Sequence, residues 1–259
     1  MDSVRRTFRA AMRRLARDET VASAGRTALV LAPHPDDETL GCGAVILRKL
    51  AAGTAVTVAV LTDGRHSHRS AALSPNELAA LRREEMAEAA RRLGLKAEAV
   101  RWAGFVDGTL ADRFDDLVRY VAGLLDELAP NEVYATSAAE PHPDHAALGR
   151  AARVAVSGRA TVLLEYPVWL WGYWPLRRGD RFGSTVDALG RLLRRRIVRV
   201  RAGEYLAGKL NALEAHESQL RRPARVPADE EWAVLPAPVL AAARDSAELF
   251  LPWTAHPRT

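Results

Sequence analysis

Apolar and polar positions change their period near residue 27. Before this point Val4, Phe8, Met12 and Leu15 recur at helical spacing among many arginines, which predicts a basic amphipathic helix over about Met1–Ala22. After it, short β-rich apolar runs alternate with longer helical ones, which is typical of βαβ units. The chain is therefore expected to form an α/β fold: a Rossmann-like, mostly parallel sheet with flanking helices and a C-terminal extension.

Five strands and four helices are expected where the alternation is regular. The strands are expected over about Ala28–Ala32, Ala55–Thr62, Ala99–Trp102, Glu132–Thr136 and Thr161–Tyr166. The helices are expected over about Thr39–Ala52, Pro75–Leu93, Arg113–Leu128 and Ala146–Val156. Near-continuous apolar strands such as the second are expected when both faces of a sheet are covered.

The alternation weakens after the fifth strand. An aromatic loop over Trp169–Trp174 is of a kind that often borders a pocket. Beyond it the pattern predicts a strand over about Arg196–Arg201, helices over about Tyr205–Leu220 and Pro238–Leu251, and a proline-rich connection between these helices. We expect a helical segment over residues 1–24 and a single domain over 25–259, with a core at about 27–167 and a pocket-shaping part at about 168–259.

Length and composition are those of one globular domain. The chain has 259 residues, of which 48% are apolar and 27% charged, unlike disordered or fibrous chains. The formal charge of +5 comes from arginines spread over several helical segments beside Asp and Glu, so no nucleic-acid partner is expected. Cys42 is the only cysteine, and no apolar run approaches about 18 residues. We therefore expect a cytoplasmic protein with no transmembrane segment and no secretory signal.

The basic N-terminal helix leaves two interpretations open. Either its apolar face docks on its own domain or on a second subunit of a homo-oligomer, or residues 1–22 make a peripheral contact with an anionic membrane surface. Docking is the interpretation that we favour.

Two turns rich in His and Asp follow predicted strands. The first strand is followed by Pro33-His34-Pro35-Asp36-Asp37-Glu38, and the fourth by Glu140-Pro141-His142-Pro143-Asp144-His145. Loops that leave the carboxyl ends of parallel strands line a common crevice, so the two turns are expected to lie together. Imidazole and carboxylate groups suit Zn²⁺, and a catalytic zinc site usually takes three protein ligands. The turns therefore predict a metal site, while Asp37 and Asp144 are also suited to capping helices.

These turns carry a resemblance to a known family. The pair resembles the AHPDDE and HPDH motifs of the LmbE-like, or PIG-L, N-acetylglucosaminyl deacetylases, and weaker similarity extends over roughly Thr27–Leu220. The resemblance implies a Zn²⁺-dependent deacetylase domain in which His34, Asp37 and His145 bind the metal.

The same resemblance implies further roles. Asp36 would be the general base, His142 would stabilise the oxyanion or protonate the leaving amine, and Asp144 would orient a histidine. Asp36 and His142 both remain candidates for the proton donor. Asp107 aligns with a position that contacts sugar hydroxyls in related deacetylases, and an exposed turn aspartate is an equal alternative. Arg69 is a further candidate for substrate contact.

Other polar residues have plainer interpretations. His66 and His68 fit a loop surface as well as they fit a substrate contact. His216 is expected to pack or to cap a helix rather than to be a fourth ligand, and Cys42 is expected to pack near a helix start.

The expected reaction removes an N-acetyl or other N-acyl group from an amino sugar or small glycoconjugate. Zn²⁺ is the expected ion, and a His/Asp site also binds Fe²⁺. Arg65 stands where relatives often carry an acidic residue, so a particular sugar specificity does not transfer. Two alternatives remain open. One is a metal-dependent hydrolase of another ester or amide, such as a phosphate or carbamoyl ester, and the other is a non-catalytic peripheral membrane or partner-binding protein.

Overall fold

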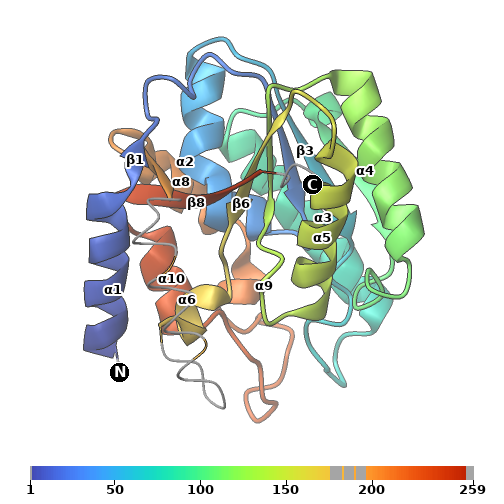
Figure 1. The fold of residues 1–259 in the computed structure, drawn as a ribbon. Helices are drawn as coiled ribbons and strands as arrows, with labels where there is room; N and C mark the ends of the chain where they lie inside the picture. Colours follow the sequence, from blue (N-terminus) through green and yellow to red (C-terminus); the bar gives the residue numbers. More distant parts are fainter. Residues whose placement is uncertain (1, 176–182, 184–189, 191–196, 255–259) are drawn as a thin grey trace.

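An eight-stranded sheet runs through the described part of this computed structural model, which is residues 2–175, 183, 190 and 197–254 (Figure 1). In pairing order the strands are β1 (Arg17–Asp18), β7 (Val198–Arg201), β8 (Ala247–Trp253), β6 (Val162–Tyr166), β5 (Glu132–Thr136), β2 (Ala28–Ala32), β3 (Val56–Thr62) and β4 (Val100–Phe105). β8 is antiparallel to both of its neighbours, and the other pairs are parallel. The predicted α/β class with a mostly parallel sheet is confirmed.

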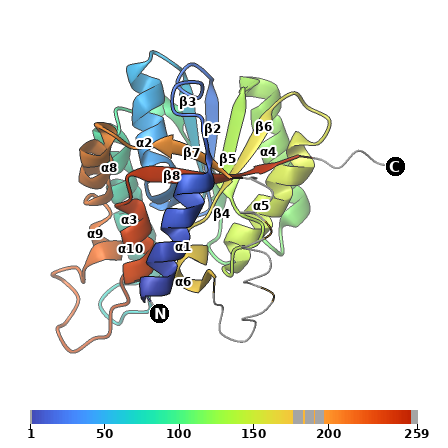
Figure 2. The same cartoon turned by 60° about the vertical axis from the view of Figure 1, so that its left-hand side comes forward.

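Helices cover both faces of the sheet. They are α1 (Asp2–Leu15), α2 (Asp37–Ala51), α3 (Pro75–Arg92), α4 (Phe114–Leu128), α5 (Pro143–Val156), α6 (Leu170–Tyr173), α8 (Tyr205–Leu213), α9 (Glu217–Leu220) and α10 (Ala237–Ala243), with a 3₁₀ turn, η1, at Ala97–Ala99. Figure 2 shows α2, α3 and α8 on one side of the sheet and α4 and α5 on the other.

The interior strand β2 consists entirely of apolar residues. Ala28 and Val30 pack into the hydrophobic cluster that contains residues of α2 and α3. Leu29 and Leu31 point the other way, into the cluster beneath α4 and α5. Because successive side chains of a strand point to opposite faces, a strand covered on both sides is apolar at every position.

The C-terminal part departs from the prediction. The helix expected over Pro238–Leu251 is wrong in its second half, because α10 ends at Ala243 and the residues from Ala247 form β8. This strand fills the space between β6 and β7, and a short apolar run does not reveal such a pairing by its periodicity. The helix expected over Tyr205–Leu220 is two helices, α8 and α9. Of the strand expected from Arg196, Arg196 itself lies outside the described residues.

The N-terminal helix is shorter than predicted and packs on its own domain. It ends at Leu15 instead of continuing to Ala22, because the chain then forms β1 beside β7. Met12 is completely buried in a cluster with residues of α6 and β8 and with Ile197, which precedes β7. Arg9 lies 2.9 Å from the carboxylate of Asp245, which also binds Arg13. None of the described helices is both long enough and apolar enough to cross a membrane.

Candidate metal centre

The two His/Asp turns meet because their strands are neighbours. β2 and β5 pair in parallel, so the turns that follow them leave the same edge of the sheet. A cavity of about 360 Å³ opens between them. Its lining comes from the two turns, the start of α2, the loops after β3 and β4, α3 and the C-terminal part: His34, Asp36, Asp37, Leu40, His66, Ser67, His68, Arg82, Asp107, Gly108, His142, His145, Val168, Trp169, Gln219, Ala233, Val234 and Leu235.

Three side chains aim one ligand atom each at a common point. Nδ1 of His34 lies 3.2 Å from Nε2 of His145, and Oδ2 of Asp37 lies 3.3 Å from each of these nitrogens. Ligand atoms around a tetrahedral ion with bonds of about 2.0–2.1 Å are about 3.3–3.4 Å apart. The donor types and their separations therefore fit a metal ion bound by His34, Asp37 and His145.

Electrostatics in this cluster also suit a cation. Burial lowers the pKa of His145 to about 3, so its imidazole is neutral, as a metal ligand must be. Burial opposes a charge on His34, but Asp107, Asp144 and Asp37 outweigh it and raise its pKa well above the usual value. These carboxylates place negative charge where an ion would lie.

Neither aspartate that was suited to capping a helix does so. α2 begins at Asp37 itself, and Asp36 occupies the cap position without a side-chain cap hydrogen bond. α5 begins at Pro143, and its cap is His142, whose Nδ1 accepts a hydrogen bond of 3.3 Å from the backbone N–H of Asp144. The capping interpretation of Asp37 and Asp144 is therefore wrong.

Asp144 and Asp107 lie beside Nε2 of His34. Nε2 of His34 is 3.1 Å from Oδ1 of Asp107 and 3.3 Å from Oδ2 of Asp144, although neither contact has hydrogen-bond alignment. Asp144 also accepts the backbone N–H groups of Gly108 and Leu110. Asp107 accepts the backbone N–H of His66 and is only 6% exposed, so it is not an exposed turn residue. Both carboxylates are placed to orient His34.

Asp36 lies beside the ligands on a strained backbone. Its φ of 120° is a conformation that residues with a side chain rarely adopt, and such strain often marks functional sites. Its backbone N–H donates to Oε2 of Glu38 at 3.0 Å, which holds the turn. Burial, with smaller contributions from Asp37 and Glu38, raises its pKa above the usual range, while Arg82 acts against this shift.

Arg82 is a cavity residue to which sequence reasoning gave no role. Its Nη2 lies 3.5 Å from Oδ2 of Asp36 and donates to the carbonyl oxygen of Pro35, while Nη1 donates to that of Gly64. Gly64 has a φ of +66°, and a Cβ there would clash with the guanidinium, so this turn requires glycine. Arg69, the predicted substrate contact, lines a neighbouring hollow and not the metal cavity.

Segments far along the chain complete the cavity wall. Ala233, Val234 and Leu235 line it from the proline-rich connection. His68 stacks on Trp232 with ring centres 3.9 Å apart, so the loop after β3 contacts this connection. His216 is fully buried, and its Nε2 lies 3.4 Å from Oε1 of Glu38.

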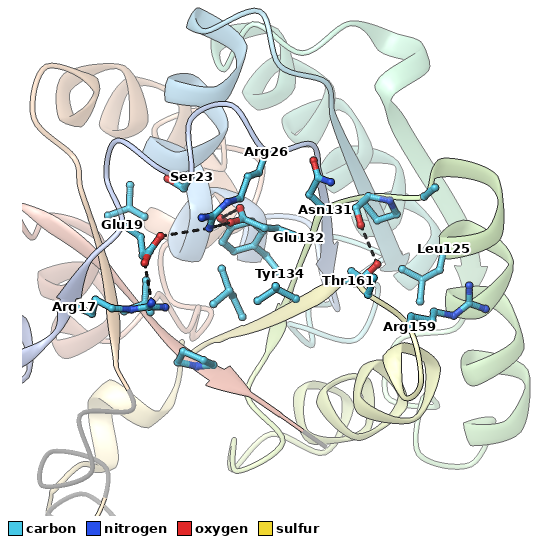
Figure 3. A pocket seen from close by; sticks show the side chains of 18 residues that line it. Arg17, Glu19, Ser23, Arg26, Leu125, Asn131, Glu132, Tyr134, Arg159 and Thr161 are labelled. Atoms are coloured by element: carbon cyan, nitrogen blue, oxygen red, sulfur yellow. Dashed lines mark hydrogen bonds and ion pairs between the residues drawn. The ribbon is translucent and has the colours of Figure 1, made fainter. Parts of the chain in front are cut away.

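A second cavity, of about 790 Å³, lies at the opposite edge of the sheet, where β5, β6 and β7 begin (Figure 3). Its charged groups are paired. Glu132 binds Arg26 at 3.0 Å, Lys49 at 2.8 Å and the hydroxyl of Tyr134 at 2.6 Å, and Glu19 binds Arg17 and Arg26. This cavity is larger than the one at the His/Asp turns but holds no convergent set of free ligand atoms among the described residues.

Part of the chain matches a known protein family. Residues 29–156 match the family model described as PIG-L: GlcNAc-PI de-N-acetylase. A similar curated protein is the probable N-acetyl-alpha-D-glucosaminyl L-malate deacetylase 2 of Bacillus cereus, which is 31% identical over 137 residues. That match covers 51% of this chain and 61% of the relative, less than two thirds of its length.

Solved structures share the fold. The conserved protein TT1542 of Thermus thermophilus is 27% identical with a TM-score of 0.60, over 90% of this chain and 99% of that one. The N,N'-diacetylchitobiose deacetylase of Pyrococcus horikoshii is 24% identical with a TM-score of 0.56, over 76% and 72%. The 4-carboxy-2-hydroxymuconate hydratase of Pseudomonas putida is 18% identical with a TM-score of 0.52, over 90% and 98%. Since a hydratase shares the fold, the fold alone does not determine the reaction.

Proposed function

We propose that this chain, whose residues 29–156 belong to the PIG-L (LmbE-like) family, is a metal-dependent N-deacetylase that acts on an N-acetylated amino sugar or small glycoconjugate. The observation that carries the proposal is the convergence of His34, Asp37 and His145, with ligand atoms 3.2–3.3 Å apart, in the cavity that Asp36 also lines. Zn²⁺ is the proposed ion, and Fe²⁺ suits the same donors.

The side chains around the ligands supply the acid–base chemistry. A bound ion of this kind polarises the amide carbonyl and acidifies water. Asp36 removes a proton from the attacking water, a task that its raised pKa suits. Because Nδ1 of His142 accepts the N–H of Asp144, its proton is on Nε2, from which it donates to the developing oxyanion. Asp36 or His142 then protonates the leaving amine.

The charge of the cavity supports an amide over a phosphate ester. Asp36, Asp37 and Asp107 line it, while Arg82 is the only lysine or arginine among the described lining residues and is 2% exposed. A phosphate ester would bring further negative charge against these carboxylates. A neutral acetamido group brings none, so the charge balance favours an N-acyl substrate.

The non-catalytic membrane role has less support. The middle of the apolar face of α1 packs on the domain, where Met12 is buried and Phe8 contacts Trp174 edge-to-face at 6.3 Å between ring centres, and only Val4 and Leu15 of the predicted apolar positions are exposed. We retain a cytoplasmic location and a homo-oligomeric state as proposals from the sequence.

The proposal is tested with metal-loaded enzyme and a substrate panel. The panel contains N-acetylglucosamine glycosides with several aglycones, a phosphate monoester and a carbamoyl ester, and release of free amine or phosphate is measured. We expect amine from the N-acetyl sugars only, and loss of this activity after chelation. Turnover of the phosphate or carbamoyl ester without any amide cleavage would overturn the proposal.

A further inference from the structure

Glu140 is a buried carboxylate that belongs to the second turn but is not one of the three metal ligands. It is 5% exposed and lies two residues before His142. Its Oε1 accepts the backbone N–H of Val168 at 2.6 Å, and its Oε2 accepts those of Trp169 at 3.0 Å and Leu170 at 3.2 Å. One side chain therefore joins the loop after β5 to the loop after β6.

In this contact both carboxyl oxygens of Glu140 serve as hydrogen-bond acceptors. Burial raises the pKa of Glu140 to about 8, while the three N–H groups act against this shift. Both carboxyl oxygens accept N–H donors, and no described residue accepts a hydrogen bond from Glu140. Three backbone N–H groups that donate to one carboxyl group hold the two loops at a fixed separation, and ionisation of that group strengthens the bonds.

The loop that Glu140 holds forms part of the wall of the metal cavity. Val168 and Trp169 line the cavity together with the polar residues His66 and Asp107. Trp171 and Trp174 do not line it, since they are buried in the cluster with Met12. Within the aromatic loop Trp169–Trp174, Trp169 is the only residue that lines the cavity. The backbone N–H of Trp169 is one of the three that donate to Glu140.

We infer that Glu140 is a positioning residue that fixes the separation between the Trp169 wall and the His142 turn, and thereby limits the size of the acyl group that the site accepts. This inference rests on the proposed N-deacetylase function. Glu140 does not line the cavity. It acts through the backbone of residues 168–170 on one side and through the two-residue link to His142 on the other.

Hydrogen exchange tests the contact without any activity assay. In Glu140→Gln one oxygen becomes an N–H₂ group that faces N–H donors, so amide exchange in the peptide covering Val168–Leu170 should speed up by about tenfold or more relative to wild type. Glu140→Asp keeps both acceptor oxygens on a shorter side chain and should give a smaller increase. Glu165→Gln is the matched control: Glu165 is 1% exposed and binds Arg153 and Ser137, but not these amides. Unchanged exchange in Glu140→Gln overturns the inference and leaves the proposed function intact.

Acyl-chain selectivity tests the consequence. N-acetyl-, N-butyryl- and N-octanoylglucosamine are compared with metal-loaded wild type and the three variants. In Glu140→Gln, kcat/KM for the longer acyl substrates divided by kcat/KM for the N-acetyl substrate should rise by about tenfold, which is a typical effect of a change in an apolar pocket. The metal content of this variant should equal that of wild type. Glu140→Asp should restore most of the wild-type ratio, and Glu165→Gln should keep it. An unchanged ratio in an active Glu140→Gln overturns the role in selectivity, and a wild type that releases no amine from any substrate overturns it together with the proposed function.

Discussion

The two edges of the parallel sheet hold cavities that differ in size and in charge balance. At the amino ends of the strands, the cavity of about 790 Å³ is lined by Glu132 and Arg26, which bind each other (Figure 3), and Lys49 binds the same carboxylate. At the carboxyl ends, the cavity is about 360 Å³, and Nδ1 of His34 and Nε2 of His145 meet a carboxylate oxygen of Asp37 at 3.3 Å.

The difference shows what identifies a candidate site. Charges at the amino edge neutralise one another, so the network is complete as a structural unit. At the carboxyl edge, Asp37, Asp107 and Asp144 surround His34 and raise its pKa, and Asp36, whose own pKa is raised by burial, lies 3.5 Å from Arg82. Convergent ligand atoms and perturbed pKa values are better indicators of function here than cavity volume.

Removing a ligand from the carboxyl edge should have the largest effect. In Asp37→Ala or His34→Ala, metal content should fall to background and deacetylase activity should disappear, because two protein ligands do not hold a catalytic ion well. Elemental analysis of the purified protein, together with release of amine, measures both. Full metal content in Asp37→Ala would show that the ion binds elsewhere.

Removing the proposed base should separate chemistry from metal binding. Asp36→Asn is isosteric and leaves all three ligands in place, so metal content should equal that of wild type. Because the amide cannot take a proton from water, kcat should fall by about 10²- to 10⁴-fold. Steady-state kinetics on the metal-loaded variant measure this loss. Normal turnover would mean that another group acts as the base.

A change at the amino edge should leave turnover unaltered. The ammonium group of Lys49 binds Glu132 at 2.8 Å and the carbonyl oxygens of Ser23 and Arg26, and the side chain is 1% exposed. Breaking a buried pair usually costs about 3–5 kcal/mol, so Lys49→Met should lower the free energy of unfolding by about that amount in urea titrations.

The kinetics of Lys49→Met test whether the two edges of the sheet act independently. At a temperature where Lys49→Met is folded, its kcat and metal content should match those of wild type within about twofold, since Lys49 touches no residue of the metal cluster. Arg91→Ala, in an exposed pair with Glu88, serves as a control that should change stability by less than about 1 kcal/mol. A large fall in kcat for Lys49→Met would show that the two edges are coupled.

Local signals in the sequence predicted most of the fold, and the family resemblance supplied the proposed ligand set. The start of α3 follows from Ser74 and Pro75, and the capping box between Ser74 and Glu77 is present. β8 was missed because its antiparallel pairing with β6 and β7 is not encoded in its own periodicity. The end of α1 was placed too far along for a similar reason, since β1 exists only through its pairing with β7.

The sequence by itself determined which groups are the candidates for the chemistry. His34, Asp37 and His145 stand in turns after strands, and parallel strands bring such turns to one edge. The tertiary structure alone decided the surroundings of these groups, because burial, charge balance and contacts such as those of Arg82 with Asp36 and of Glu140 with the Trp169 loop join segments that are distant in the chain. A local sequence pattern does not give the distance between two side chains that come together only in the folded protein.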